Sequence, residues 1–501
     1  MSASEAPGPL PLAIGLDPGS GVPLHAQLRD ALREAILARR LVPGSRLPAS
    51  RVLAADLGCA RGTVLLALEQ LAAEGYLVAR TGSGTRVAAV PPEEFAPPAP
   101  SPAGRSLTPP VLSRRGAALA AAGPRAYLSG PEAPDAFALG RPARDAFPFA
   151  TFAKLIQAEW REGSPPAPHP LGLPALRGAV AAYLAAGRGV ACAPEDVIVT
   201  AGIRQSLRLL ARLLLDPGEA AYVEEPGFPG IARALAEAGL RPVPVPVGPG
   251  GLAVAAARAI EPAARLAVVT PAHHYPLGHA MSLENRLDLL AWARAAGGWI
   301  VEDDYDGAYR YAGRPLAPLR SLDREGRVIY VGSFSKVLLP ALQLSYLVLP
   351  PGLAGPVQRA LAESGPAPAG LGQGALARFI AEGHLAAHLR RTRRLYALRQ
   401  EALVAAARRH AGLLDLAPLA GGMHLVARPG PLWPAGLDDV RAAGACAAAG
   451  IAVVALSAYH AGPAAEPGLL LGYAAVPEQA MAPAVDRMGA ALRGALTAPP
   501  R

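Results

Sequence analysis

The sequence predicts two folded parts: an N-terminal α+β winged helix-turn-helix, then an α/β part with a large, mostly parallel sheet and a small C-terminal α/β domain. Three observations support this prediction. The first ninety residues combine helical periodicity with a glycine-tipped hairpin, a segment rich in proline and alanine follows them, and strand-like and helix-like segments then alternate. A chain of 501 residues can hold two or three domains. We expect a first domain over residues 1–90, a linker over 91–125 and the α/β part over 126–501.

The first helix is predicted after Pro23, a residue that favours the first turn of a helix. It carries an apolar stripe at four-residue spacing: Leu24, Leu28, Leu32 and Ile36. Ser50 is expected to cap a short second helix over residues 51–57, which Gly58 would end.

A third helix is expected over residues 61–74, with Val64, Leu68 and Leu71 facing inward. Two helices joined by a tight turn that contains glycine form a helix-turn-helix. Residues 76–89 read as a hairpin with the tip Thr-Gly-Ser-Gly-Thr, which is the wing.

The motifs PGSRLPASRxLAxxLG, RGTV and LAAEGYLxxRTGSGTxVA resemble the GntR-type winged helix over nearly all of residues 23–89. The resemblance implies that the third helix enters the major groove of double-stranded DNA and that the wing follows the backbone. The alternative for each arginine is a solvated surface charge. The residues that the resemblance assigns to DNA are Arg51, Arg61, Thr63, Gly82 and Ser83.

In the second part, strands are expected at 196–200, 221–225, 266–270, 299–301, 328–331 and 344–349. Helices are expected between them at 206–215, 231–238 and 284–296, and a last helix at 478–496. Such alternation predicts a mostly parallel sheet with helices on both faces.

Lysine is rare in this chain, because only Lys154 and Lys336 are lysines among the 48 lysines and arginines. A lysine can become a neutral amine that attacks an aldehyde, which an arginine cannot do near pH 7. Lys336 lies between two strand-like runs in Gly-Ser-Phe-Ser-Lys, without another charge nearby, and is the candidate for chemistry. Lys154 is expected on a helix surface and receives no role.

A second candidate segment is Trp-Ile-Val-Glu-Asp-Asp-Tyr-Asp, at residues 299–306, where an apolar strand runs directly into acids. Open α/β sheets bind ligands at the carboxyl ends of their strands. Asp303 and Tyr305 alternate along the strand and therefore share one face.

VEDDYD and GSFSKxLLPxL together resemble the aminotransferase-type domain of MocR-type (GabR-like) transcription regulators. The resemblance implies a class I (fold-type I) aminotransferase fold and the cofactor pyridoxal 5'-phosphate. By this resemblance Lys336 is the catalytic Schiff-base lysine, Asp303 keeps the pyridine nitrogen protonated, and Tyr305 contacts the phenolic oxygen.

Further cofactor contacts are expected around these three residues. The segment from Thr200 to Ser206 opens a helix after a strand, so free backbone N–H groups there form a phosphate seat. His274 lies in PAHHYPLG, where the family usually has glutamine. The expected additional contacts are Ala201, Gly202, Ser333, His274 and Phe228.

Three departures from the family pattern concern positions that normally bind anions. Gln343 stands where an arginine usually grips the cofactor phosphate, and Ala167 opens the segment that usually supplies a tyrosine to the partner subunit. Ala475 replaces an arginine that pairs with the ligand carboxylate. We therefore expect modest cofactor affinity and poor turnover of amino acids.

The composition limits the remaining classes of protein. Cys59, Cys192 and Cys446 are widely scattered, which gives neither a disulfide framework nor a metal site. Neither a signal peptide nor an apolar run of about 20 residues is present, so the cytoplasm is the expected location. A net charge of +9 permits nucleic-acid binding.

The leading hypothesis is a homodimeric transcription regulator that uses pyridoxal 5'-phosphate and senses an amine, an amino acid or the cofactor itself. One alternative is an active aminotransferase with a DNA-binding appendage. The other is a cofactor-free regulator that uses the fold only to dimerise. The sequence gives neither the operator nor the sign of regulation.

Overall fold

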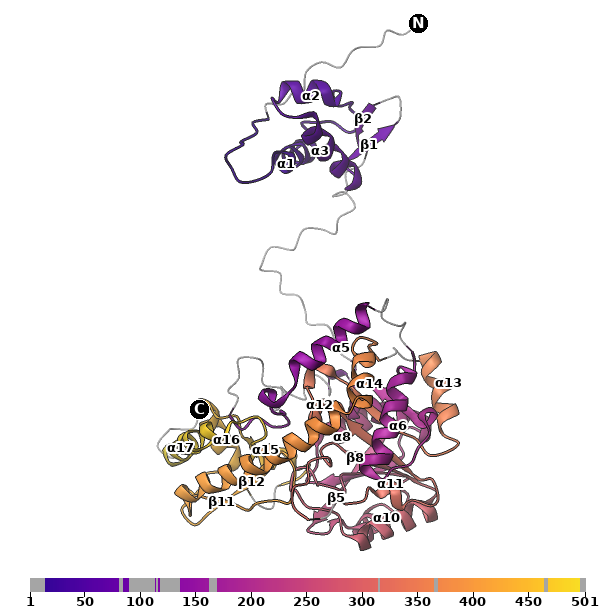
Figure 1. Cartoon of the computed structure of the whole chain (residues 1–501), viewed down its shortest axis with the longest axis vertical. Coiled ribbons are helices and arrows are strands. Elements are labelled where there is room, and N and C mark those ends of the chain that lie inside the picture. Colours follow the sequence, from indigo (N-terminus) through magenta and orange to yellow (C-terminus); the bar gives the residue numbers. More distant parts are fainter. Residues whose placement is uncertain are drawn as a thin grey trace. The chain divides into compact units, whose positions relative to one another are not determined.

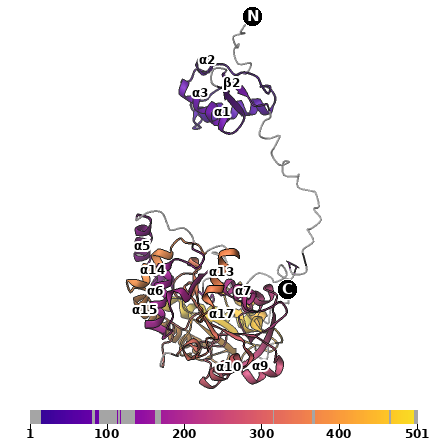
Figure 2. The same cartoon turned by 90° about the vertical axis from the view of Figure 1, so that its right-hand side faces the viewer.

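The structure is a computed structural model, which describes residues 14–80, 84–89, 113, 116–117, 136–161, 169–313, 316–364, 368–463 and 467–495. The chain divides into two compact units, residues 1–112 and residues 113–501 (Figure 1, and in a second view Figure 2). Among the described helices, none is long and apolar enough to cross a membrane.

The first unit is a three-helix domain with a two-stranded hairpin. Its elements are α1 (Leu24–Leu37), α2 (Ser50–Asp56), α3 (Arg61–Ala73), β1 (Leu77–Arg80) and β2 (Gly84–Val87). The strands pair antiparallel from Leu77 opposite Val87 to Arg80 opposite Gly84. Leu28, Leu32 and Val64 are fully buried, so the predicted helical stripes do form the core of the unit.

The predicted cap at Ser50 is wrong by one residue. Ala49 has the extended backbone of a cap position, with a ψ of 143°, and Ser50 is already the first residue of α2. The Ser50 hydroxyl instead accepts a hydrogen bond of 3.3 Å from Nε of Arg61. Gly58 follows the helix with a φ of 60°, which confirms the prediction that this glycine ends the second helix.

The second unit is built on an eight-stranded sheet in the order β3-β10-β9-β8-β7-β4-β5-β6. The strands are β3 (Val197–Thr200), β4 (Ala220–Glu225), β5 (Arg241–Gly248), β6 (Gly251–Leu252), β7 (Leu266–Val269), β8 (Trp299–Asp304), β9 (Val328–Ser333) and β10 (Ser345–Val348). Pairing is parallel except at β10 and β6. This confirms the predicted mostly parallel sheet.

Helices cover both faces of this sheet. They are α5 (Phe149–Arg161), α6 (Pro174–Arg188), α7 (Ile203–Leu214), α8 (Pro229–Glu237), α9 (Val254–Ile260), α10 (Leu283–Ala296), α11 (Leu319–Leu322), α12 (Phe334–Val337), α13 (Ala354–Ser364) and α14 (Gln373–Ala381). Val301 packs with α7 and α8 on one face, while its neighbour Ile300 packs with α9 and α10 on the other. Helices α5, α6 and α14 pack together (Figure 2).

A smaller antiparallel sheet follows, in the order β11-β12-β14-β13. It comprises β11 (Leu414–Leu416), β12 (His424–Pro429), β13 (Val454–Ala455) and β14 (Leu469–Gly472), with α15 (His384–Ala407), α16 (Asp439–Ala448) and α17 (Glu478–Gly494). This is the predicted small C-terminal α/β domain.

Strand β5 was not predicted, because its sequence Arg-Pro-Val-Pro-Val-Pro-Val-Gly alternates with proline. The Arg241 N–H donates to the Glu219 carbonyl, toward β4, whereas the Pro246 carbonyl faces the β6 side, where it accepts from Ala253. The prolines occupy the positions that face away from β4. Their missing N–H groups are therefore not needed for the long parallel ladder.

Candidate functional site

Polar residues gather at the carboxyl ends of four neighbouring strands. Strand β4 ends near Glu224, β7 is followed by Thr270, β8 ends at Asp303 and Asp304, and β9 ends at Ser333. Parallel strands bring these ends to one edge of the sheet, which is where open α/β sheets bind ligands.

Lys336 lies on the short helix α12, directly after β9. Its Nζ donates to the Gly140 carbonyl over 3.3 Å, and a Cβ at residue 140 would approach Nζ to 2.3 Å. Gly140 also has a φ of 67°, so glycine is required there on two grounds. Burial lowers the pKa of Lys336, against the raising effect of Asp303 and Asp306. A lowered pKa favours the neutral amine that nucleophilic chemistry needs.

Asp303 is the member of the acidic segment that is buried without a partner. Its carboxylate makes no hydrogen bond or ion pair with any residue that the structure describes, and only 7% of the residue is accessible. Burial raises the pKa of Asp303 to about 8, with further increases from Asp304 and Asp306, while Lys336 lowers it. A buried acid without a partner is suited to a cationic ligand.

Tyr305 lies one residue beyond β8, and its hydroxyl is 3.0 Å from Nδ1 of His273. Oδ2 of Asp306 is 2.9 Å from the same nitrogen. The sequence assigned no cofactor contact to His273, but its partner in the structure is the predicted ligand-binding tyrosine. The sequence signal for the contact between His273 and Tyr305 was the place of His273 in the segment that follows β7.

A row of hydroxyl groups crosses three strands at the same edge. The register places Ser345 of β10 opposite both Thr200 of β3 and Ser333 of β9. Thr200 Oγ1 is 2.9 Å from Ser206 Oγ, in the first turn of α7, and Ser345 donates to Ser333 over 3.3 Å. This row and the N-terminus of α7 meet where a phosphate seat was expected.

The two predicted backbone contacts before α7 differ. Gly202 is the cap residue, with a φ of 141°, which a residue with a side chain rarely adopts. The Ala201 N–H donates to the side chain of Gln205 over 2.6 Å. The N–H of Ala201 is therefore engaged by a neighbouring side chain, whereas the first N–H groups of a helix such as α7 have no partner within the helix itself.

His274 is almost fully buried, with Nε2 3.7 Å from Oε2 of Glu224. Burial lowers the pKa of His274 to about 3 and raises that of Glu224 to about 7. The ring of Phe228 lies edge-to-face with Tyr275, with 6.0 Å between their centroids. Both residues thus follow the carboxyl ends of β7 and β4, and their contacts to a cofactor stay predictions.

Further aromatic residues pack beside Phe228, and the sequence analysis did not predict them. The Tyr275 ring is 5.0 Å from the His424 ring, and its hydroxyl is 2.9 Å from that of Tyr459. His424 comes from the small sheet and contacts the Pro276 carbonyl over 2.9 Å. No short motif links residues this far apart in sequence, so only the fold brings them together.

The positions that depart from the family pattern carry no cation. Gln343 is exposed, with a φ of 47°, and Ala475 is half-buried after β14. Ala167 lies outside the described residues.

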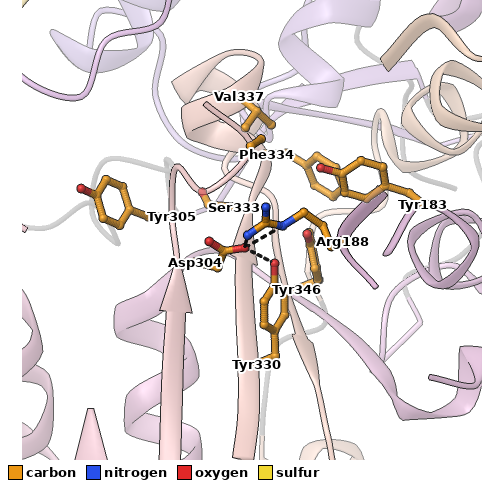
Figure 3. Close-up of a pocket in the computed structure, with 10 residues that line it drawn as sticks. Tyr183, Arg188, Asp304, Tyr305, Tyr330, Ser333, Phe334, Val337 and Tyr346 are labelled. Carbon is orange, nitrogen blue, oxygen red and sulfur yellow. Dashed lines mark hydrogen bonds and ion pairs between the residues drawn. The ribbon is translucent and has the colours of Figure 1, made fainter. Parts of the chain in front are cut away.

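Asp304 points to the opposite side of β8 from Tyr305 (Figure 3). Arg188, at the end of α6, approaches it at 2.5 Å, and Tyr330 donates to the same oxygen. The side chains of Arg188 and Asp304 are 7% and 2% accessible. The void beside them, of about 20 Å³, has room for about one water and none for a cofactor.

In the first unit, Arg51 and Arg61 are exposed near the beginnings of α2 and α3, and Thr63 is half-buried. Leu65 and Leu66 are also exposed on α3, at 38% and 48%. The predicted wing contacts Gly82 and Ser83 lie outside the described residues.

Comparisons with known proteins cover both units. The family model described as "Bacterial regulatory proteins, gntR family" matches residues 24–87, and that of "Aminotransferase class I and II" matches residues 152–488. The probable rhizopine catabolism regulatory protein MocR of Rhizobium meliloti is 42% identical over 484 residues, which cover 95% of each chain. The chain belongs to the MocR-type regulators.

Two other similar proteins agree with this assignment. The pyridoxine biosynthesis transcriptional regulator PdxR of Corynebacterium glutamicum is 33% identical, over 92% of this chain and 94% of its own. The α-aminoadipate aminotransferase LysN of Thermus thermophilus matches with a TM-score of 0.64 and 29% identity, over 72% of this chain and 92% of its own. The predicted winged helix and aminotransferase fold of this MocR-type chain are therefore confirmed.

We predict that Arg188→Met destabilises the large unit by about 3–5 kcal/mol, because Asp304 is then buried without a counter-charge. The measurement is urea unfolding followed by tryptophan emission, since all four tryptophans lie beyond residue 113. The control is Arg208→Met, which breaks a more exposed pair with Glu237 and should cost about 0–1 kcal/mol. Similar losses in the two variants would contradict the prediction.

A second prediction concerns pH. Asp303 has a raised pKa of about 8 in the folded protein, so it holds a proton that the unfolded chain releases near 3.8. Stability must therefore fall as pH rises toward 8, by about 1 kcal/mol between pH 7 and 8 from this group. Cofactor-free Asp303→Asn should lack that part of the decrease. Identical pH profiles for the two proteins in urea unfolding would refute the shift.

Proposed function

We propose that this chain is a DNA-binding transcription regulator whose large unit holds pyridoxal 5'-phosphate and senses an amine, an amino acid or the cofactor itself. One observation supports the cofactor most strongly: Asp303, buried without a partner, lies close enough to Lys336 for each to shift the pKa of the other. A pyridine ring that is protonated at nitrogen and carries an aldehyde is complementary to this pair.

The proposed roles follow from the surroundings of each residue. Lys336 would attach the cofactor covalently, Asp303 would keep the ring nitrogen protonated, and Tyr305 would donate to the phenolic oxygen while His273 orients it. When bound, the cofactor supplies an electron-accepting ring for chemistry at an amine.

The phosphate seat would be formed by Ser333, by Gly202 and by the amides at the start of α7. Ala201 would contribute only as far as Gln205 releases its N–H. His274, which follows β7, and Phe228, which follows β4, would contact the cofactor from the ends of these two strands. The seat lacks an arginine at Gln343, so we expect the cofactor to be held less tightly than in a site with a charged clamp.

The absence of a cation at Ala475 favours sensing over catalysis. An incoming carboxylate lacks a forked partner there, so the bond to be broken is poorly oriented, and misorientation is costly to rates. Regulation through cofactor occupancy or amine binding does not require that this bond be oriented for reaction. We therefore prefer a sensor with residual chemistry to an active aminotransferase.

On DNA, α3 would enter the major groove with Arg61 near base edges and Arg51 near phosphates. Thr63, Gly82 and Ser83 would add contacts to the backbone. The exposed Leu65 could meet the methyl group of thymine. One such module covers little DNA, so we propose a homodimer on paired half-sites.

Lys336→Ala is expected to abolish the visible absorbance that the protein acquires with pyridoxal 5'-phosphate, because the attaching amine is gone. Lys154→Ala is the matched control, since it is the other lysine and is exposed on α5. Borohydride reduction and peptide mass analysis should place the cofactor on Lys336. An unchanged spectrum in Lys336→Ala, or label found on Lys154, would sink the assignment.

Arg61→Ala should weaken binding to a selected operator by about 1–3 kcal/mol if the side chain reads a base. Fluorescence anisotropy of the full chain with the operator and with random DNA measures this, at one fixed salt concentration. A loss confined to the operator supports base reading. Equal losses on both duplexes would instead assign Arg61 to the phosphate backbone.

A further inference from the structure

A second cavity, of about 310 Å³, lies between the large sheet and the loop that precedes β12. It is lined by residues 272–273, 278–280, 306–307, 309–310 and 418–422, together with Arg188 and Leu316. None of Lys336, Asp303 and Tyr305 lines it. Its volume is within the range of small-molecule sites, so it can hold a ligand of its own.

Among the described residues, three buried polar atoms of the lining have no hydrogen-bond partner. They are Nε2 of His273, Nε of Arg310 and Oδ2 of Asp306. His273 is 8% accessible, and its ring lies between Gly278 and Gly422, where a Cβ would come within 3.2 Å and 2.6 Å of Nε2. Buried polar atoms without partners are costly, and a ligand that pairs with them removes this cost.

The position of the lining that suits an anion is Arg310. The guanidinium of Arg310 makes no ion pair with any carboxylate in the described part of the chain. Arg188 is already paired with Asp304, and His279 contacts the Gly248 carbonyl over 3.2 Å. The lining carboxylate, Asp306, lies 2.9 Å from Nδ1 of His273, the ring nitrogen other than the unpaired Nε2.

The lining glycines keep the floor of the cavity open. Gly421 packs so closely that a Cβ there would approach the Tyr309 carbonyl oxygen to 2.4 Å, and Gly278 faces Leu419 in the same way. The loops on the two sides are fixed to each other, because the Gly422 N–H donates to the Tyr309 carbonyl over 2.8 Å. The cavity is thus held in place by both sheets.

We propose that this cavity is a second ligand site, which binds a small carboxylate through the guanidinium of Arg310 and Nε2 of His273. A guanidinium presents two parallel N–H groups to a carboxylate, and the imidazole adds a third in the tautomer that carries its proton on Nε2 and accepts from Tyr305 at Nδ1. The site does not depend on the cofactor. Its wall is nevertheless shared with the cofactor pocket, since Nδ1 of His273 faces Tyr305.

The test uses the full chain and succinate, with the uncharged succinamide as a control, in isothermal titration calorimetry. We expect succinate to bind and succinamide to bind at least tenfold more weakly. Arg310→Gln should weaken succinate binding at least tenfold, whereas Arg294→Gln, an exposed arginine on α10, should leave it unchanged.

Two further variants keep the test decisive. Ala280→Leu narrows the cavity without removing a charge and should also weaken succinate binding, which covers the case that Arg310→Gln folds poorly. Lys336→Ala should bind succinate as the wild type does, even if it no longer takes up pyridoxal 5'-phosphate. Succinate binding that is absent in the wild type, insensitive to Arg310 and Ala280, or lost with Lys336 would overturn the proposal.

Discussion

A carboxylate buried without a partner is the constraint on which the rest of the large unit depends. Asp303 has acidic neighbours on both sides, Glu302 and Asp304, and burial raises the pKa of Asp303 and of Glu302. Such a cluster is tolerable only if the acids that bind no ligand have partners within the protein. The surrounding elements are placed accordingly.

Asp304 is neutralised by Arg188 and receives a hydrogen bond from Tyr330, while Glu302 accepts the N–H groups of Leu319 and Arg320 at 2.7 and 2.8 Å. These contacts tie α6 and α11 to the central strand and are sufficient to explain two of the three acids as structural. Asp303 receives no comparable contact from the described residues. Glu302 and Asp304, which have partners, thus have structural roles, whereas Asp303, which has none, is the candidate for ligand binding.

Much of this arrangement could be predicted locally. The apolar run that ends in acids predicted β8 from one short segment, and the scarcity of lysine over the whole chain singled out Lys336. The role of Gly140 could not be predicted, since only the folded chain brings that glycine to Nζ. The same holds for His273 against Tyr305. Strand β5 was missed for another reason: proline opposes strand formation in general but not at positions facing a sheet edge.

The contact between Lys336 and Gly140 joins the candidate reactive amine to the segment 136–140. Residues 136–140 lie between the winged unit and the sheet in chain order, and they are held by Gly472 of β14, which donates to the Phe137 carbonyl over 2.9 Å. An amine that becomes engaged elsewhere has fewer protons to give to the Gly140 carbonyl. A ligand that engaged Nζ would therefore weaken one of the contacts that hold residues 136–140 against the large unit, and the contact to Gly472 would remain.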